Sequence, residues 1–401
     1  MSESLAAPSA PELTDTEWAT RLTQRFVRER VPISGLLELT SRCNLRCVHC
    51  YLGPQKQHWD PARRSRELSL EQLRGIIDQI AEAGCLYLGI TGGDPMVHEH
   101  FPEVYRHARQ RGLLVTVLCN GILVRDEIVE LFREYPPLQV EVSLYGATRA
   151  TYEAVTEVPG SYTKCLKGIR KLLANGINVQ LKTVLMKLNG HEVGEMRRLA
   201  AGFGLELRVD GAIFPQLTDQ DQKPLAQRLT PEQVVEYEFA DRAVAEAWRE
   251  HAERVPVPAE SLYRCGAGVT GFYIDPFGNV SPCIMTTHKK QSLLERSFAS
   301  LWARELEQIR SVKPRAEYGC NSCEMQMACT SCPGFNYQEN GHDDVKSEYV
   351  CETTRVRWNR IQLEREQNGE RLPPATDRGG WAPLSWGARR ESAVSQEELI
   401  G

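Results

Sequence analysis

The sequence has no apolar run close to the ~20 residues that a membrane-spanning helix needs. Its first eighteen residues are polar and acidic, which excludes a secretory signal. It also lacks a basic excess, because 48 Lys and Arg stand against 53 Asp and Glu and give a formal net charge of −5. A nucleic-acid-binding protein would favour a basic surface. These absences predict a cytoplasmic protein whose partners are neither a membrane nor a nucleic acid.

Cysteine, in contrast, is abundant, with 13 residues in a chain of 401. An odd number of thiols in a reducing compartment argues against a disulfide framework. Ten of them fall into close groups, and clustered cysteines in the cytosol more often bind metal or do redox work. The other three, Cys85, Cys119 and Cys165, are expected to be small core residues.

From Gly35 onward the chain alternates strand-like and helix-like segments. Strands are expected at residues 36–40, 86–91, 113–118, 138–144, 177–185 and 205–209. Helices between them are expected at 69–83, 101–110, 126–134, 162–174 and 192–202. Short links between such repeats predict a parallel sheet with the helices outside it. Six repeats fall short of the eight of a closed barrel, so we expect an α/β fold with an open, partial (βα)6 barrel. Functional groups should gather at the C-terminal ends of its strands.

Composition divides the chain into five parts. We expect a partly disordered extension with one helix at 1–30, the barrel at 31–215, a bridging segment at 216–262 with one helix over 231–253, a cysteine-rich domain poor in regular structure at 263–366, and a flexible tail at 367–401.

The first cysteine group, Cys43, Cys47 and Cys50, follows the first expected strand with the spacing C-x3-C-x2-C. Three thiolates can hold three irons of a cubane [4Fe–4S] cluster and leave the fourth iron open to a chelating ligand. The alternative is a structural zinc site, which wants four ligands and would take His49 as the fourth. A loop after a barrel strand suits a catalytic site better, so the cluster is the favoured interpretation.

This spacing after strand one of a βα barrel resembles the signature of the radical S-adenosylmethionine (SAM) superfamily. The resemblance implies that the open iron binds the amino and carboxylate groups of SAM. It also implies that an electron cleaves the sulfonium and that the resulting 5′-deoxyadenosyl radical takes a hydrogen atom from a substrate. An external donor such as a flavodoxin or ferredoxin would supply the electron. His49, just before the third cysteine, would pack near the adenine.

The ends of the later strands carry further segments that resemble SAM-binding motifs of that family. Gly92, Gly93, Asp94 and Pro95 resemble its Gly-Gly-Glu-Pro motif, which contacts the methionine amino group, with Asp in place of Glu. Glycines let backbone approach a ligand closely. A plain turn is the alternative, because Gly-Gly-Asp-Pro is also good turn chemistry.

Three more SAM contacts are implied by the same resemblance: Asn120 after the third strand, Ser143 after the fourth, and Lys182 on the fifth. Tyr145 stands where relatives commonly carry Asp, which puts a ribose contact at that position in doubt. For Lys182 a surface lysine is an equal alternative. The sequence does not indicate a catalytic base.

The remaining cysteines lie in the C-terminal part, as Cys265, Cys283, Cys320, Cys323, Cys329, Cys332 and Cys351. Their order resembles the SPASM domain, which carries auxiliary iron–sulfur clusters in enzymes that modify peptides and proteins, although two residues rather than three precede Cys332. The resemblance implies one or two auxiliary [4Fe–4S] clusters. The first would be held by Cys265, Cys283 and Cys332 with an open or non-cysteine position, and the second by Cys320, Cys323, Cys329 and Cys351. A pair of zinc knuckles is the alternative.

We therefore expect a radical SAM maturase that crosslinks or oxidises a ribosomally made precursor peptide, with a separate leader-binding protein as a possible partner. A SPASM enzyme acting on a small molecule such as a tetrapyrrole is a second hypothesis. A sulfatase-type maturase is disfavoured, because Ile284 follows Cys283 where that relative carries an Asp base. A non-enzymatic zinc or redox scaffold is the fourth hypothesis.

Two other signals carry little weight. The segment 266–271 matches G-x-G-x-x-G, but a dinucleotide-binding loop must follow a strand and open a helix, and this segment enters a strand. The polar loop 98–100 is expected to lie beside the SAM site without binding metal.

Overall fold

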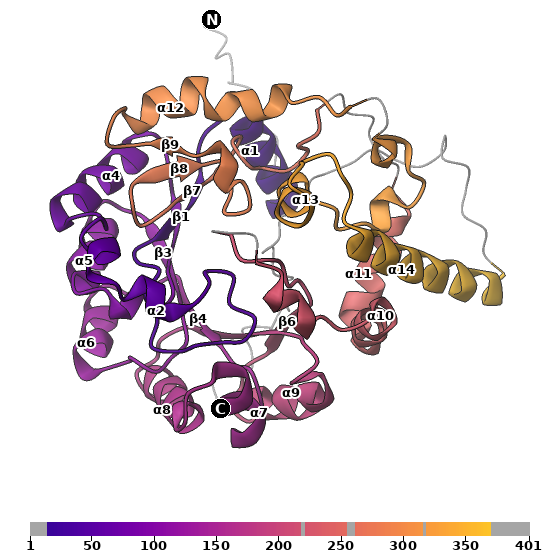
Figure 1. The fold of residues 1–401 in the computed structure, drawn as a ribbon, viewed down its shortest axis with the longest axis horizontal. Coiled ribbons are helices and arrows are strands. Elements are labelled where there is room, and N and C mark those ends of the chain that lie inside the picture. Colours follow the sequence, from indigo (N-terminus) through magenta and orange to yellow (C-terminus); the bar gives the residue numbers. More distant parts are fainter. Residues whose placement is uncertain (1–13, 218–220, 255–260, 316–317, 370–401) are drawn as a thin grey trace, which may run out of the picture.

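The computed structural model describes residues 14–217, 221–254, 261–315 and 318–369. Its centre is one nine-stranded sheet in the order β6-β5-β4-β3-β2-β1-β7-β8-β9 (Figure 1). The first six strands in sequence are all parallel to their neighbours, as the sequence predicts. They are β1 Ser34–Glu38, β2 Tyr87–Thr91, β3 Leu114–Cys119, β4 Gln139–Ser143, β5 Val179–Val184 and β6 Leu207–Asp210.

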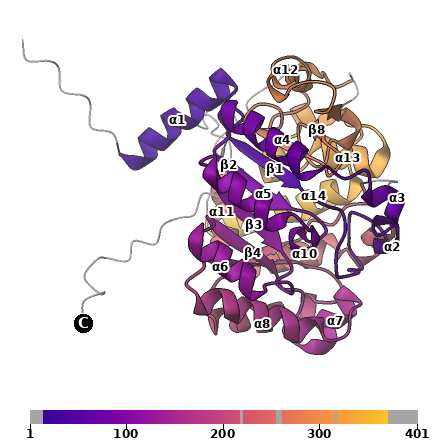
Figure 2. The same cartoon turned by 90° about the vertical axis from the view of Figure 1, so that its left-hand side faces the viewer.

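Helices cover the outer face of this sheet, as the view from its side shows (Figure 2). The larger ones between the strands are α4 Leu70–Glu82, α5 Phe101–Gln110, α6 Asp126–Glu134, α7 Arg149–Thr156, α8 Ser161–Ala174 and α9 Val193–Ala201. A capping box opens α4, where Ser69 Oγ accepts from the Gln72 backbone N–H and the Gln72 side chain accepts from the Ser69 N–H. The helix α7 was not predicted.

The barrel strands are buried and rich in valine, leucine and isoleucine. In β3 every second residue is buried, and Val115 and Val117 are fully enclosed. Val140 and Val142 of β4 are enclosed in the same core, which the helices complete from outside. The alternate residues of each strand face the inside of the partial barrel, so the sheet has a packed outer face and an inner face available for function.

Three further strands extend the sheet beyond β1: β7 Gly271–Ile274, β8 Asn279–Ser281 and β9 Gln291–Ser292. The β7 strand pairs in parallel with β1, and β8 and β9 follow antiparallel. The turn between β7 and β8 is formed at Pro276 to Gly278. The C-terminal cysteine-rich part is thus joined to the barrel edge by backbone pairing.

The C-terminal half contains more regular structure than the sequence indicated. Its helices are α10 Pro231–Ala240, α11 Arg242–Ala252, α12 Phe298–Arg304, α13 Pro333–Asn340 and α14 Glu348–Gln367. The single helix expected over 231–253 is wrong, because Asp241 ends α10 and caps α11 by accepting from the backbone N–H groups of Ala243 and Val244. The prediction that the cysteine-rich domain at 263–366 is poor in regular structure is also wrong, since it contains the long helix α14, on which Cys351 lies.

Short helices and the chain ends complete the fold. The loop after β1 contains α2 Gln55–His58 and α3 Pro61–Arg64. The N-terminal helix α1 Asp15–Glu29 leads away from the sheet in Figure 2. The disorder expected at the N-terminus and in the tail falls mainly on residues 1–13 and 370–401, which lie outside the described residues. No helix among the described residues is long and apolar enough to cross a membrane.

Candidate functional site

The inner face of the partial barrel encloses a cavity of about 890 Å³, which we call the cluster cavity. The thiol-bearing residues Cys43, Cys47 and Cys50 line it, together with Gly92 and Gly93. Its size is within the range of small-molecule and cofactor sites. The structure therefore brings the first cysteine group and the glycine pair to one place, at the C-terminal ends of β1 and β2.

The loop that carries the three cysteines is held from several sides. The Cys43 backbone N–H donates to Gln55 Oε1 of α2 at 2.6 Å. The backbone N–H groups of Arg46 and Val48 donate to carbonyl groups at the end of α7, each at 3.0 Å. The buried guanidinium of Arg42 pairs with Glu67 at 2.8 Å. These contacts fix the positions of the thiols without using the sulfur atoms.

The three thiols are mutually close and desolvated. Burial raises the pKa of Cys43 to about 12 and also raises the pKa of Cys50. It raises the pKa of Cys47 well above its ordinary value, and the neighbouring sulfurs of Cys43 and Cys50 add to that rise. No three His, Cys, Asp or Glu side chains among the described residues converge on a single metal ion. Soft sulfur donors spread around a cavity fit a cubane cluster, whose irons are held at separate corners and whose charge would stabilise the thiolates.

The glycine pair allows close packing against the cysteine loop. A Cβ at Gly93 would lie 2.5 Å from the Arg42 carbonyl oxygen, and one at Gly92 would lie 2.5 Å from the Thr40 carbonyl oxygen. The Gly93 N–H donates to that Thr40 carbonyl at 2.8 Å. Any side chain here would push the cysteine loop away, so the glycines keep both segments at the cavity wall.

Asp94 and Pro95 behave differently from the two glycines, because neither lines the cluster cavity. The Asp94 carboxylate is fully buried and accepts hydrogen bonds from the backbone N–H groups of Met96, at 3.0 Å, and Asn120, at 2.9 Å. Burial raises its pKa to about 6. Asp94 thus ties the end of β2 to the end of β3, which is a positioning role.

Asn120 connects this tie to the cysteine loop. Its side-chain amide donates to Asn44 Oδ1 at 2.8 Å and lies 3.7 Å from Cys43 Sγ. Ser143 also lines the cavity, at the end of β4. Asn120 and Ser143 are therefore placed where a ligand of the cavity would meet them.

His49 and Tyr145 form an aromatic part of the cavity wall, with ring centroids 4.8 Å apart in an edge-on arrangement. Burial lowers the pKa of His49 to about 4, so the ring is neutral at physiological pH. Its Nδ1 is buried and has no hydrogen-bond partner within the described part of the chain. A neutral ring with a spare polar atom suits contact with a purine base.

Lys182 lies on the inner face of β5 and lines the cluster cavity, so the surface-lysine alternative does not describe it. Its ammonium pairs with Glu141 of β4 at 3.0 Å. Glu141 is also 3.9 Å from Arg208 of β6. The pair crosses neighbouring strands and gives this wall of the cavity a polar character.

The C-terminal cysteines separate into two groups in space. Cys332 interacts electrostatically with Cys265 and Cys283. Cys320 interacts in the same way with Cys323, Cys329 and Cys351. Cys265 and Cys283 also line the cluster cavity, with Ile284 beside them. The first of these groups thus faces the same cavity as Cys43, Cys47 and Cys50.

The other cysteines and the discounted motifs lie partly in the core and partly at the cavity wall, where Gly266, Ala267 and Gly271 line the cluster cavity. Cys85 and Cys165 are buried in the core, whereas Cys119 is buried at the cavity wall. The glycine-rich segment 266–271 forms turns and enters β7 rather than a helix. His98 is buried, and burial lowers its pKa to about 4.

The sequence reasoning missed one buried carboxylate near the site. Glu38 ends β1 and is 1 % exposed, with Ser41 Oγ donating to it at 2.8 Å and the Tyr273 hydroxyl of β7 donating to its other oxygen. Burial raises the pKa of Glu38 to about 7. Its place at the C-terminal end of a parallel strand is the one sequence signal that could have indicated it.

Comparisons with known proteins agree with this geometry. Residues 37–200 match the family model of the Radical SAM superfamily. The chain is 29% identical over 336 residues to the mycofactocin maturase MftC of Mycolicibacterium smegmatis, covering 79% of this chain and 82% of that protein. It is 27% identical over 257 residues to the subtilosin biosynthesis protein AlbA of Bacillus subtilis, covering 64% of this chain and 55% of that protein. It is 25% identical over 336 residues to the AdoMet-dependent heme synthase of Methanosarcina barkeri, covering 78% of this chain and 94% of that protein.

The fold is shared with solved structures. The crystal structure of Streptococcus suis SuiB bound to S-adenosylmethionine superposes with a TM-score of 0.62 and 15% identity, over 87% of this chain and 83% of that one. The α/β architecture with its parallel sheet is thus shared with that structure. Residues 37–200 of the chain thus form a radical SAM domain.

Proposed function

We propose that the protein is a maturase that modifies a ribosomally made precursor peptide, forming a crosslink or an oxidised residue. The observation that carries this proposal is the similarity to a maturase over 79% of the chain, which is more than the barrel alone. SuiB, which shares the fold, was also solved bound to the precursor peptide SuiA.

Within this proposal, Cys43, Cys47 and Cys50 hold the catalytic [4Fe–4S] cluster. When bound, that cluster and SAM supply a 5′-deoxyadenosyl radical that takes a hydrogen atom from the substrate. Gly92 and Gly93 let the cysteine loop pack closely against the end of β2, and both line the cavity wall where the methionine end of SAM would bind. His49 contacts the adenine, and Asn120, Ser143 and Lys182 line the remaining path of the cosubstrate. Asp94 and Pro95 support this site from behind.

The seven C-terminal cysteines hold two auxiliary [4Fe–4S] clusters. Cys265, Cys283 and Cys332 hold the first, which borders the cluster cavity, and the four cysteines around Cys320 hold the second. Cys265, Cys283 and Cys332 would hold the first auxiliary cluster beside the cluster cavity, where it would supply an acceptor for the surplus electron of the substrate, and an external donor such as a flavodoxin or ferredoxin would supply the reducing electron. A leader-binding protein is a possible further partner.

We assign the barrel to residues 31–215, the bridging helices to 216–262 and the auxiliary-cluster domain to 263–366. The strands β7 to β9 belong to this last part by sequence and to the barrel sheet by pairing.

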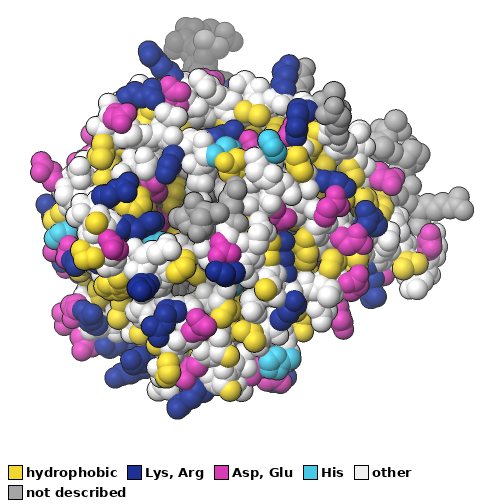
Figure 3. Space-filling view, in the orientation of Figure 1, with side chains coloured by type: hydrophobic (Ala, Val, Ile, Leu, Met, Phe, Trp, Pro, Cys, Tyr) yellow, Lys and Arg dark blue, Asp and Glu magenta, His cyan; other side chains and the backbone are white. Residues whose placement is uncertain are grey.

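On the face seen in Figure 1, basic and acidic side chains are interspersed, so that face offers no extended basic field to a nucleic acid (Figure 3).

A small-molecule substrate is the second candidate function, and one observation favours it. Heme synthases of two organisms are each 25% identical to the chain over 78% of its length. A sulfatase-type maturase finds less support, because Ile284 presents an apolar side chain to the cluster cavity where a proton acceptor would be needed.

Anaerobic reconstitution tests the cluster assignment. We expect about twelve irons per chain and formation of 5′-deoxyadenosine on reduction with SAM. Cys47→Ala should abolish 5′-deoxyadenosine formation, and Cys351→Ser should lower the iron content by about four. Cys85→Ala is the matched control, because Cys85 is buried in the core and belongs to neither the first cysteine group nor the C-terminal cysteines. This variant should leave the iron content and the formation of 5′-deoxyadenosine unchanged. Full SAM cleavage by Cys47→Ala would contradict the assignment.

The substrate class is tested by co-expression with short peptides encoded beside the gene, followed by mass spectrometry of the peptides. A loss of two hydrogens, or another defined mass change that depends on Cys47, is expected for a maturase. Turnover of a tetrapyrrole, with no change in any peptide, would favour the second candidate.

A further inference from the structure

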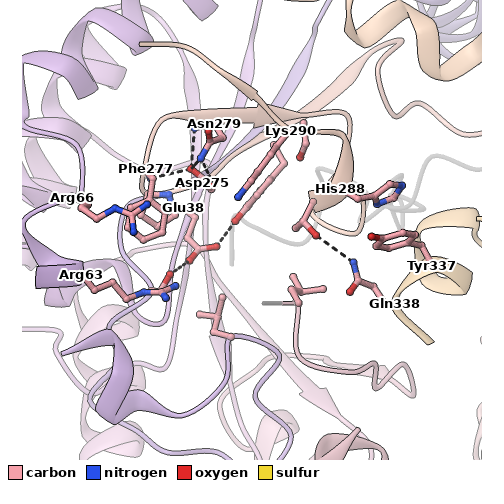
Figure 4. Close-up of a pocket in the computed structure, with 17 residues that line it drawn as sticks. Glu38, Arg63, Arg66, Asp275, Phe277, Asn279, His288, Lys290, Tyr337 and Gln338 are labelled. Carbon is pink, nitrogen blue, oxygen red and sulfur yellow. Dashed lines mark hydrogen bonds between the residues drawn. The ribbon is translucent and has the colours of Figure 1, made fainter. Parts of the chain in front are cut away.

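A second cavity, of about 610 Å³, lies next to the cluster cavity and has no role in the proposed chemistry. We call it the basic cavity, after Arg63, Arg66 and Lys290 in its lining. It is formed between the helical loop after β1, the β7–β8 hairpin and the second half of α13 (Figure 4). Leu52 and Tyr273 line both cavities, so a bound chain could extend from one into the other.

The carboxylates of this cavity are already engaged. Asp275 accepts from the backbone N–H groups of Phe277 and Asn279, each at 2.9 Å, and from the Asn279 side chain. Glu38 accepts from the hydroxyls of Ser41 and Tyr273, and its raised pKa of about 7 reduces its negative charge near neutral pH. Neither group is therefore a strong free acceptor for a basic ligand.

The cations, in contrast, are less engaged, and the charge interaction that acts on a carboxylate of the cavity is that of Arg63, which lowers the pKa of Glu38 against the larger effect of burial. Within the described residues no ion pair joins Arg63, Arg66 or Lys290 to an Asp or Glu. The two arginines instead lie against the face of Phe277, with their guanidinium carbons 5.3 and 5.4 Å from the ring centroid. The Nε of Arg63 is buried and has no hydrogen-bond partner. Figure 4 shows Arg63 and Arg66 on one wall beside Phe277 and Lys290 extending inward from the hairpin side.

Basic side chains outnumber acidic ones in the lining of this cavity, whereas acidic residues outnumber basic ones in the chain as a whole. Three unpaired cations face two carboxylates that are internally bonded, in a protein of net charge −5. A buried donor without an acceptor is destabilising, and an anionic ligand would supply the missing acceptor. Arginine side chains match the planar geometry of a carboxylate, and the apolar ring below them limits competition by water.

We propose that the basic cavity binds a carboxylate group of the peptide substrate through Arg63, Arg66 and Lys290. The carboxylate belongs either to an Asp or Glu side chain or to the peptide C-terminus. This inference rests on the proposed peptide substrate and deepens it. Because the two cavities share Leu52 and Tyr273, the anchored carboxylate fixes which part of the peptide reaches the cluster cavity.

Affinity selection from peptide mixtures tests this proposal without knowledge of the natural substrate. The full chain is incubated with three acetylated heptapeptide mixtures and the retained peptides are counted by mass spectrometry. One mixture has a C-terminal amide and no acidic residue, one has a free C-terminal carboxylate, and one has an amide and a single internal Glu. We expect at least one carboxylate mixture to be retained about tenfold better than the neutral one. Which of the two is retained identifies the source of the carboxylate.

The double variant Arg66→Gln, Lys290→Gln should lose this preference, because it removes two of the three proposed carboxylate contacts. Both side chains are exposed, so the substitutions should leave the core intact. Arg64→Gln is the matched control, because Arg64 is bonded to Glu99 and does not line the cavity. Equal retention of all three mixtures, no retention of any, or an unchanged preference in the double variant would overturn the proposal. Formation of 5′-deoxyadenosine by the double variant is measured in parallel. Its persistence separates a failure of carboxylate binding from a failure of the proposed radical chemistry.

Discussion

Substitution of Gly93 by alanine tests how closely the end of β2 must approach the cysteine loop. The added Cβ would lie 2.5 Å from the Arg42 carbonyl oxygen and 2.6 Å from its carbonyl carbon, both backbone atoms next to Cys43. Ordinary contacts begin at 3.4 Å, so the two segments would have to separate by about 0.9 Å. Backbone cannot rotate away as a side chain can. The hydrogen bonds from Gly93 to Thr40 and from Asp94 to Arg42 would lengthen as a result.

Overpacking of this kind costs about 1–3 kcal/mol, and two weakened hydrogen bonds add about 1 kcal/mol. We therefore expect Gly93→Ala to lower the free energy of unfolding of the cluster-free chain by about 3 kcal/mol, measured by urea titration with circular dichroism. After reconstitution, the variant should hold fewer irons and form less 5′-deoxyadenosine, because Cys43 moves with Arg42.

Gly75→Ala provides the matched control. Gly75 lies inside α4, and a Cβ there would meet no atom within 4 Å. Alanine is favoured over glycine inside a helix by about 0.5–1 kcal/mol, so this variant should be slightly more stable than the parent and load its clusters normally. If Gly93→Ala matched the parent in stability, iron content and SAM cleavage, the close-packing argument would be refuted.

Two other perturbations follow from buried charges. Arg357→Met should destabilise the chain by about 3–5 kcal/mol in urea titrations, because the buried guanidinium bonds both Glu238 oxygens and the Ala328 carbonyl. Arg355→Met, on the same helix but exposed, should cost under about 1 kcal/mol, and equal losses would contradict this account. For Glu38, the folded-state pKa of about 7 lies above the ordinary 4.5, so its contribution to stability is complete below pH 4.5 and is lost as the pH rises through 7. Glu38→Gln should remove about 3 kcal/mol of the fall in unfolding free energy of the cluster-free chain between about pH 5 and about pH 8, and an unchanged pH profile would show that Glu38 ionises normally.

Much of the barrel could be predicted from sequence because its strands are continuous apolar segments between clear helix starts. Segments such as Leu114–Cys119 have few alternatives once a parallel sheet is expected. The helix α7 was missed because its eight residues are too short to show a helical period. The break between α10 and α11 depends on whether Asp241 continues a helix or caps one, and local sequence allows both.

The site was predictable where residues are close in sequence. The cysteine spacing indicated one thiol group, and the glycine pair pointed to a close backbone approach. The contact between Glu38 and Tyr273 joins residues 235 positions apart, so no local pattern contains it. The buried position of the Asp94 carboxylate likewise depends on the backbone N–H of Asn120, which follows the next strand, β3. Long-range pairs of this kind decide which polar residues face a cavity and which brace it.

The pairing of β7 with β1 has a consequence for any attempt to dissect the protein. Residues Ser34 to Leu37 are matched with Gly271 to Ile274, and Phe272 fills the space that Gly35 leaves open. Truncation before residue 263 would remove β7 and leave β1 as an exposed, apolar edge strand whose backbone N–H and C=O groups on that side have no hydrogen-bond partners. Exposed edge strands pair with strands of other chains, so the shortened protein should aggregate rather than fold as a soluble, active unit.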